Sequence, residues 1–208
     1  MTSAVPTSST DDTDLPHVLR SGVQLGIFQA VLIATFGLLQ PKLTGAVELV
    51  VLGAILIVGI AGTIALPGSR TKARTIEGIA GAAGIGLLAT VVFLLADVAI
   101  LQPIGVYTNR WREIGGGSNW WYHPVWWMVG TYLPGMGAWV LANQAAKSGA
   151  PNPVALVVGT VVLAVVVMAA AATFKFPGAS FGLGTFAVAT LPALALLVIV
   201  SSFGARRH

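Results

Sequence analysis

Apolar residues fill six long runs of this chain, and short polar breaks separate the runs. The runs cover residues 21–40, 45–66, 78–101, 125–143, 153–174 and 181–203. Each run is close to the about 20 apolar residues with which an α-helix crosses a hydrocarbon core of about 30 Å. The pattern therefore predicts an all-α, polytopic integral membrane protein, built as a bundle of about six transmembrane helices.

Proline, glycine and polar residues make up the breaks. They read QPK at 40–42, PGSR at 67–70, KSGAP at 147–151 and FPG at 176–178. Such residues end helices and restore polarity. Before the first run, residues 1–20 are rich in Ser, Thr, Asp and Pro, so we expect a polar, flexible cytoplasmic tail there. A short basic C-terminus, residues 204–208, follows the last run and is also expected in the cytoplasm.

Lysine and arginine divide unevenly between the two ends of such a bundle. Of eleven, seven fall on the side of the termini and four on the opposite side: Arg20, Arg70, Lys72, Arg74, Lys147, Arg206 and Arg207 against Lys42, Arg110, Arg112 and Lys175. Short cytoplasmic loops carry the excess of positive charge in membrane proteins. We therefore expect both termini in the cytoplasm (N-in/C-in) and an aromatic loop, 102–124, on the extracytoplasmic side.

Composition agrees with a membrane location and excludes one class of partner. Hydrophobic residues make up 56% of the chain and charged residues 9%, with a mean hydropathy of +0.86. That leaves too little polar surface to cover a water-soluble domain. The net charge of +4 is scattered singly between apolar runs, without the basic stripe of a nucleic-acid-binding protein. The Ala, Gly and Val bias is typical of GC-rich bacterial genomes, so we expect a multi-pass protein of the bacterial cytoplasmic (inner) membrane.

Side chains for cofactor and catalytic chemistry are scarce. The absence of cysteine excludes thiolate metal sites and iron–sulfur ligation within this chain. The histidines, His17, His123 and His208, cannot supply the paired axial ligands of a two-haem membrane anchor. The sequence has no H-E-x-x-H or Walker motif. We therefore expect a non-enzymatic protein without metal or cofactor in this chain alone.

An unusually dense aromatic segment, YTNRWREIGGGSNWWYHPVWW, occupies residues 107–127. Tryptophan and tyrosine favour the headgroup zone of a membrane, so an interfacial belt explains part of it. Consecutive tryptophans diverge by about 100° on a helix and cannot all face lipid. The surplus rings therefore predict a contact surface for a partner polypeptide, lipid or an apolar ligand. Its residues are Trp111, Trp120, Trp121, Tyr122, Trp126 and Trp127.

Two further patterns concern helix packing. Gly78, Gly81 and Gly84 lie on one strip of the third predicted helix, and small residues let membrane helices approach closely. We interpret this strip as a packing face. In the fourth predicted helix, Pro134 and Gly135 lie near the middle. Because proline removes a backbone hydrogen bond, we expect a kink there.

Acidic side chains inside the predicted spans form the last candidate site. Glu48 and Asp97 fall within runs two and three, about one turn below the outer surface. Ionisable groups at that depth are costly and commonly functional. Together with Arg110, Arg112 and His123 they form a candidate ion or ligand site. The alternative interpretation is a set of structural ion pairs whose long side chains reach the interface.

Two functions fit these features. The first is a non-enzymatic integral membrane subunit or accessory protein of a larger membrane complex, with membrane lipid and other membrane subunits as partners and the Trp-rich outer face as contact surface. The second is a small ion- or proton-coupled carrier that uses Glu48 and Asp97. Both acids lie near one membrane face, whereas alternating access favours a site near the midplane, so the subunit is the preferred hypothesis.

Overall fold

The computed structural model describes residues 11–106 and 122–204, with residues 122–124 as backbone. These parts of the chain are helical and contain no strand. The elements in chain order are α1 (Leu15–Leu39), the 3-10 turn η1 (Gln40–Lys42), α2 (Gly45–Arg70), α3 (Ile76–Ala96), the π-helical turn η2 (Asp97–Leu101), α5 (Tyr122–Ser148), α6 (Pro153–Thr173) and α7 (Leu183–Ser202). The predicted all-α fold is confirmed.

Five of the six α-helices in the described ranges are long and apolar enough to cross a membrane. These spans are Leu15–Lys42, Gly45–Arg70, Ile76–Leu101, Pro153–Thr173 and Leu183–Ser202. The chain is a multi-pass membrane protein. The remaining helix, α5, has 27 residues, but its tryptophans, glycines and proline lower its hydropathy. Whether α5 counts as a sixth span is therefore judged from its position in the bundle.

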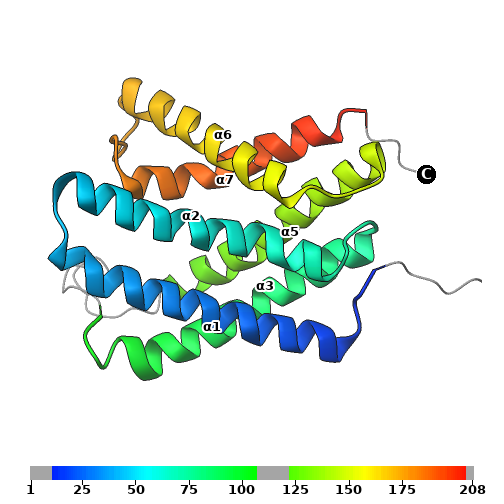
Figure 1. Ribbon diagram of the computed structural model, residues 1–208, viewed down its shortest axis with the longest axis horizontal. Coiled ribbons are helices and arrows are strands. Elements are labelled where there is room, and N and C mark those ends of the chain that lie inside the picture. Colours follow the sequence, from blue (N-terminus) through cyan, green and yellow to red (C-terminus); the bar gives the residue numbers. More distant parts are fainter. Residues whose placement is uncertain (1–10, 107–121, 205–208) are drawn as a thin grey trace, which may run out of the picture.

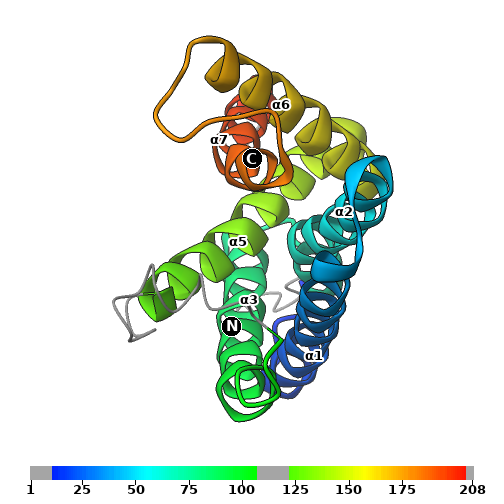
Figure 2. The same ribbon diagram turned by 90° about the vertical axis from the view of Figure 1, so that its left-hand side faces the viewer.

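The helices run up and down, and both ends of the described chain lie at one end of the bundle (Figure 1). We call this end, which holds residues 11–14, 71–75 and 149–152, the terminal end. Seen along the bundle, α5 crosses obliquely between the group α1, α2, α3 and the pair α6, α7 (Figure 2). It packs against α2, α3 and α7, so α5 joins the two groups.

Close backbone contacts hold α5 in this position. A Cβ placed on Gly68 of α2 would lie 2.7 Å from Cα of Ala138, and one on Gly137 would meet the carbonyl of Ile64. On the α3 side, a Cβ on Gly86 would meet the carbonyl of Gly130. Only glycine permits such approach, and in lipid close packing of this kind drives helix association.

The predicted glycine strip of α3 does not take part in these contacts with α5. A Cβ on Gly81 would lie 2.9 Å from Cγ2 of Thr13, and Gly78 faces Asp11, so both accommodate the segment before α1. At Gly84 the nearest atom would be Cγ1 of Val18, at an ordinary 3.9 Å. The close contact of α3 with α5 therefore involves Gly86 and not the three glycines of the strip.

Helix boundaries differ from the sequence expectation mainly at α1. It begins at Leu15, inside the segment expected to be a tail, because Asp14 caps it: Oδ2 accepts the backbone N–H of His17 at 3.1 Å. Pro16 also fits the first turn, where its missing N–H costs nothing. Residues 11–20 thus belong to the folded domain as far as the structure describes them.

Candidate functional site

Asp97 is the most buried acidic side chain among the residues that the structure describes. It opens the π-helical turn η2 and is 1% exposed. Nε2 of Gln102 donates to its Oδ2 at 2.7 Å, and the backbone N–H of Gln102 donates to its carbonyl oxygen at 2.9 Å. π-helical turns frequently occur at functional sites. Asp97 is therefore both buried and hydrogen-bonded.

Glu48 is less buried than Asp97. It lies in the first turn of α2 and is half-buried. Within the described ranges, no hydrogen bond or ion pair links the two acids. The other predicted members, Arg110 and Arg112, lie outside the described residues, and so does the side chain of His123. The predicted cluster stays a prediction, with Asp97 as its best-defined member.

The aromatic surface is described from Val125 onward. Four consecutive side chains of α5 are exposed: Val125 by 48%, Trp126 by 36%, Trp127 by 50% and Met128 by 72%. Because four successive helical residues cover about 300° of the circumference, this turn, which we call the aromatic turn, projects from its neighbours. Trp126 packs against Phe93 of α3 in a tilted arrangement, with ring centroids 5.4 Å apart and an interplanar angle of 56°. Trp111, Trp120, Trp121 and the side chain of Tyr122 lie outside the described residues.

The predicted kink site lies where α5 touches α3. α5 continues without a break through Pro134 and Gly135, and Pro134 is fully buried. Proline at 134 lacks the N–H that would normally bond to the carbonyl of Gly130. That same carbonyl faces Gly86 of α3, where a weak Cα–H donor can approach it. The proline thus shapes a helix contact.

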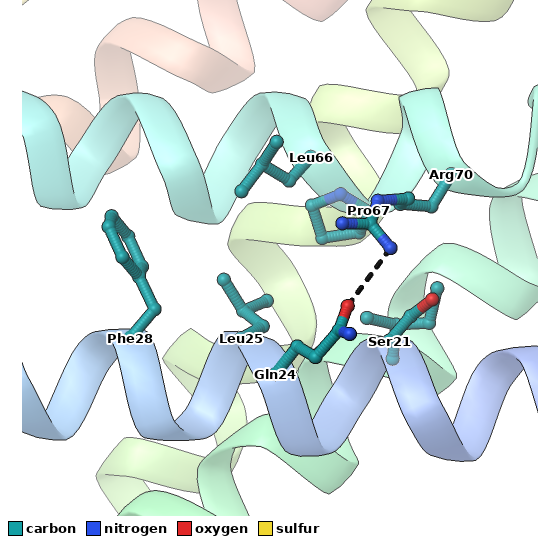
Figure 3. Close-up of a pocket in the computed structure, with 8 residues that line it drawn as sticks. Ser21, Gln24, Leu25, Phe28, Leu66, Pro67 and Arg70 are labelled. Atoms are coloured by element: carbon teal, nitrogen blue, oxygen red, sulfur yellow. Dashed lines mark hydrogen bonds between the residues drawn. The ribbon is translucent and has the colours of Figure 1, made fainter.

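A pocket between α1, α2 and α3 was not predicted. Its volume is about 360 Å³, and Figure 3 shows its lining side chains as sticks. The lining residues are Ser21, Gln24, Leu25, Phe28, Leu66, Pro67, Arg70 and Ile85. Its polar members come from helices far apart in sequence, so the sequence gives no signal for their meeting. The only local hint is that Arg70 follows Pro67 in a break between two apolar runs.

Metal binding finds no support in the described part of the chain. Among those residues, no group of three or more His, Cys, Asp or Glu side chains is arranged to hold an ion. Comparison of the chain with protein-family models, with curated proteins and with solved structures gives no match.

Proposed function

We propose that this chain is a non-enzymatic subunit of a larger assembly in the bacterial cytoplasmic membrane, and that the aromatic turn, Val125–Met128, contacts a transmembrane helix of another subunit. The observation that carries the proposal is the exposure of all four side chains around the helix. Two are tryptophans and one is methionine, residues enriched where proteins meet.

The contact on α3 supports the same proposal. The ring of Trp126 is braced by Phe93, which is itself 4% exposed. A braced ring loses little conformational entropy when a partner covers it, which favours binding. Trp127 and Met128 lie beside it on α5 and offer the larger exposed fractions. An interfacial lipid belt is the competing role for this turn, and the experiment separates the two.

The test is extraction of native membranes in mild detergent, followed by sizing and mass spectrometry of the proteins that co-migrate. A stoichiometric partner should be lost from the double variant Trp127→Ala, Met128→Ala. The matched control is Ile199→Ala, Val200→Ala on α7, where the side chains are 54% and 61% exposed. Retention of the partner by the aromatic variant, or equal loss from the control, counts against the proposal.

A carrier function has one observation in its favour, the nearly complete burial of Asp97 in a π-helical turn. In this role Asp97 exchanges a proton or cation and Glu48 assists. Proton flux into liposomes should then fall with Asp97→Asn at unchanged protein yield, and Glu48→Gln shows whether the second acid takes part. Flux that is the same as in empty liposomes rules the carrier out.

A further inference from the structure

We propose that the pocket between α1, α2 and α3 binds an anionic membrane phospholipid, with the phosphate at Arg70 and the beginning of an acyl chain in the apolar half. This site is separate from the aromatic turn and does not depend on the proposed subunit role.

The polar residues of the pocket lie at the side of the pocket that faces the terminal end of the bundle. Arg70 is the last residue of α2, and its Nη1 donates to Oε1 of Gln24 on α1 at 3.0 Å. Ser21 lies one turn earlier on α1 and is 5% exposed. Figure 3 shows the Arg70 guanidinium reaching from α2 towards Gln24. The Arg70 guanidinium from α2 thus lies beside one turn of α1 that carries the Gln24 amide and the Ser21 hydroxyl.

The charge of Arg70 is not balanced within this group. Its side-chain partner is the neutral amide of Gln24. In the described part of the chain, the ion pair found joins Lys72 to Asp12, away from the pocket lining. A guanidinium has five donors in a planar fork, and phosphate oxygens match that geometry. Arg70 is exposed, so an anionic phosphodiester can reach its guanidinium and supply the opposite charge that Gln24 lacks.

The rest of the pocket is apolar and extends towards the membrane interior. Leu25 and Ile85 form buried walls, at 4% and 1% exposure, while Leu66 is 43% exposed at the open side. Phe28 closes the far end of the pocket, where its ring packs on Gly62. A Cβ placed on Gly62 would lie 2.5 Å from Cε1 of Phe28. Ser21 and Phe28 are separated by roughly 10 Å along the helix, from the rise of about 1.5 Å per residue. A lipid placed this way has its head at the interface and its chain in hydrocarbon.

The volume and the location both favour a membrane lipid over a water-soluble anion. About 360 Å³ lies at the lower end of ligand pockets, enough for a headgroup and the start of one chain. The partly open side lets the remaining chain follow the apolar surface of the bundle. Basic pockets between transmembrane helices commonly hold anionic headgroups on the cytoplasmic side.

The experiment uses the full chain in nanodiscs that contain equal amounts of phosphatidylglycerol and phosphatidylcholine. Native mass spectrometry counts the lipids that stay bound after release from the disc. One phosphatidylglycerol per chain should be retained about tenfold in preference to phosphatidylcholine, the discrimination expected of one charge-assisted contact. Arg70→Gln should remove this preference, while the matched control Arg74→Gln, an exposed arginine outside the lining, should keep it within about twofold.

A second variant covers the case in which Arg70→Gln does not fold. Ser21→Leu fills the polar end without changing the net charge and should also abolish retention. Oleate is added in a parallel sample to separate a phospholipid from a free fatty acid. Retained phosphatidylglycerol in the presence of oleate supports the proposal. Equal retention of the two phospholipids, replacement of phosphatidylglycerol by oleate, or unchanged retention in Arg70→Gln or Ser21→Leu overturns it.

Discussion

Substitution of Asp11 should destabilise the bundle more than substitution of its neighbour Asp12. The Asp11 side chain is 4% exposed and docks at the N-terminus of α3. Oδ1 accepts the backbone N–H of Arg74 at 3.1 Å, and Oδ2 accepts those of Thr75 and Gly78 at 3.0 and 3.1 Å. The hydroxyl of Thr75 also donates to Oδ2, at 2.5 Å. One carboxylate thus satisfies a helix N-terminus from 63 residues away in sequence.

The expected cost follows from what Asp11→Ala leaves behind. Water can reach the N–H of the exposed Arg74, but the N–H of Gly78 is buried and keeps only the Thr75 hydroxyl, at 3.5 Å. Loss of hydrogen bonds to a charged group costs about 1.5–3 kcal/mol, so we expect about 2 kcal/mol. For a chain of this size, that corresponds to a fall in melting temperature of about 4–8 °C.

The neighbouring aspartate provides the matched control. Asp12 pairs with Lys72 at 2.9 Å, but the two side chains are 44% and 65% exposed, and such pairs contribute about 0–1 kcal/mol. Thermal unfolding of both alanine variants in one detergent, at one scan rate, measures the difference. Equal melting temperatures for Asp11→Ala and Asp12→Ala would refute the inference that the buried carboxylate caps α3.

Two further predictions concern packing and topology. Gly86→Ala should lower the free energy of unfolding by about 1–3 kcal/mol, because the new methyl group meets the Gly130 carbonyl, whereas Gly84→Ala on the same helix should leave the melting temperature almost unchanged. Because the chain has no cysteine, single cysteines at the exposed positions Ala150 and Ser180 report sidedness. In intact cells an impermeant maleimide should label Ser180→Cys but not Ala150→Cys, and the reverse pattern would contradict termini in the cytoplasm.

Hydropathy alone was sufficient for the fold class, because bilayer thickness fixes the length of each apolar run. Hydropathy was less informative for α5. The glycines and proline that allow its close contacts with α2 and α3 also lower the mean hydropathy of this helix. The start of α1 was readable in principle: Asp14 followed by Pro16 is a helix-start signal, although the surrounding polar residues resemble a tail.

The sites depend on how the helices pack, which the pattern of apolar runs does not specify. Burial of an acid at membrane depth was expected for Asp97 and Glu48 alike, yet the first is buried and the second half-buried. The lipid pocket needs Arg70 of α2 beside Gln24 of α1, 46 residues earlier. Such a pairing depends on how two helices cross, which apolar runs do not specify.

The central claim, that the aromatic turn contacts another membrane subunit, is tested most directly by site-specific photo-crosslinking in native membranes. A benzoylphenylalanine in place of Met128, which is 72% exposed, should yield a discrete protein adduct of defined mass. The same probe in place of Val200 on α7, 61% exposed, should yield only lipid adducts. Lipid adducts alone at both positions would contradict the account and would leave the aromatic turn as an interfacial anchor.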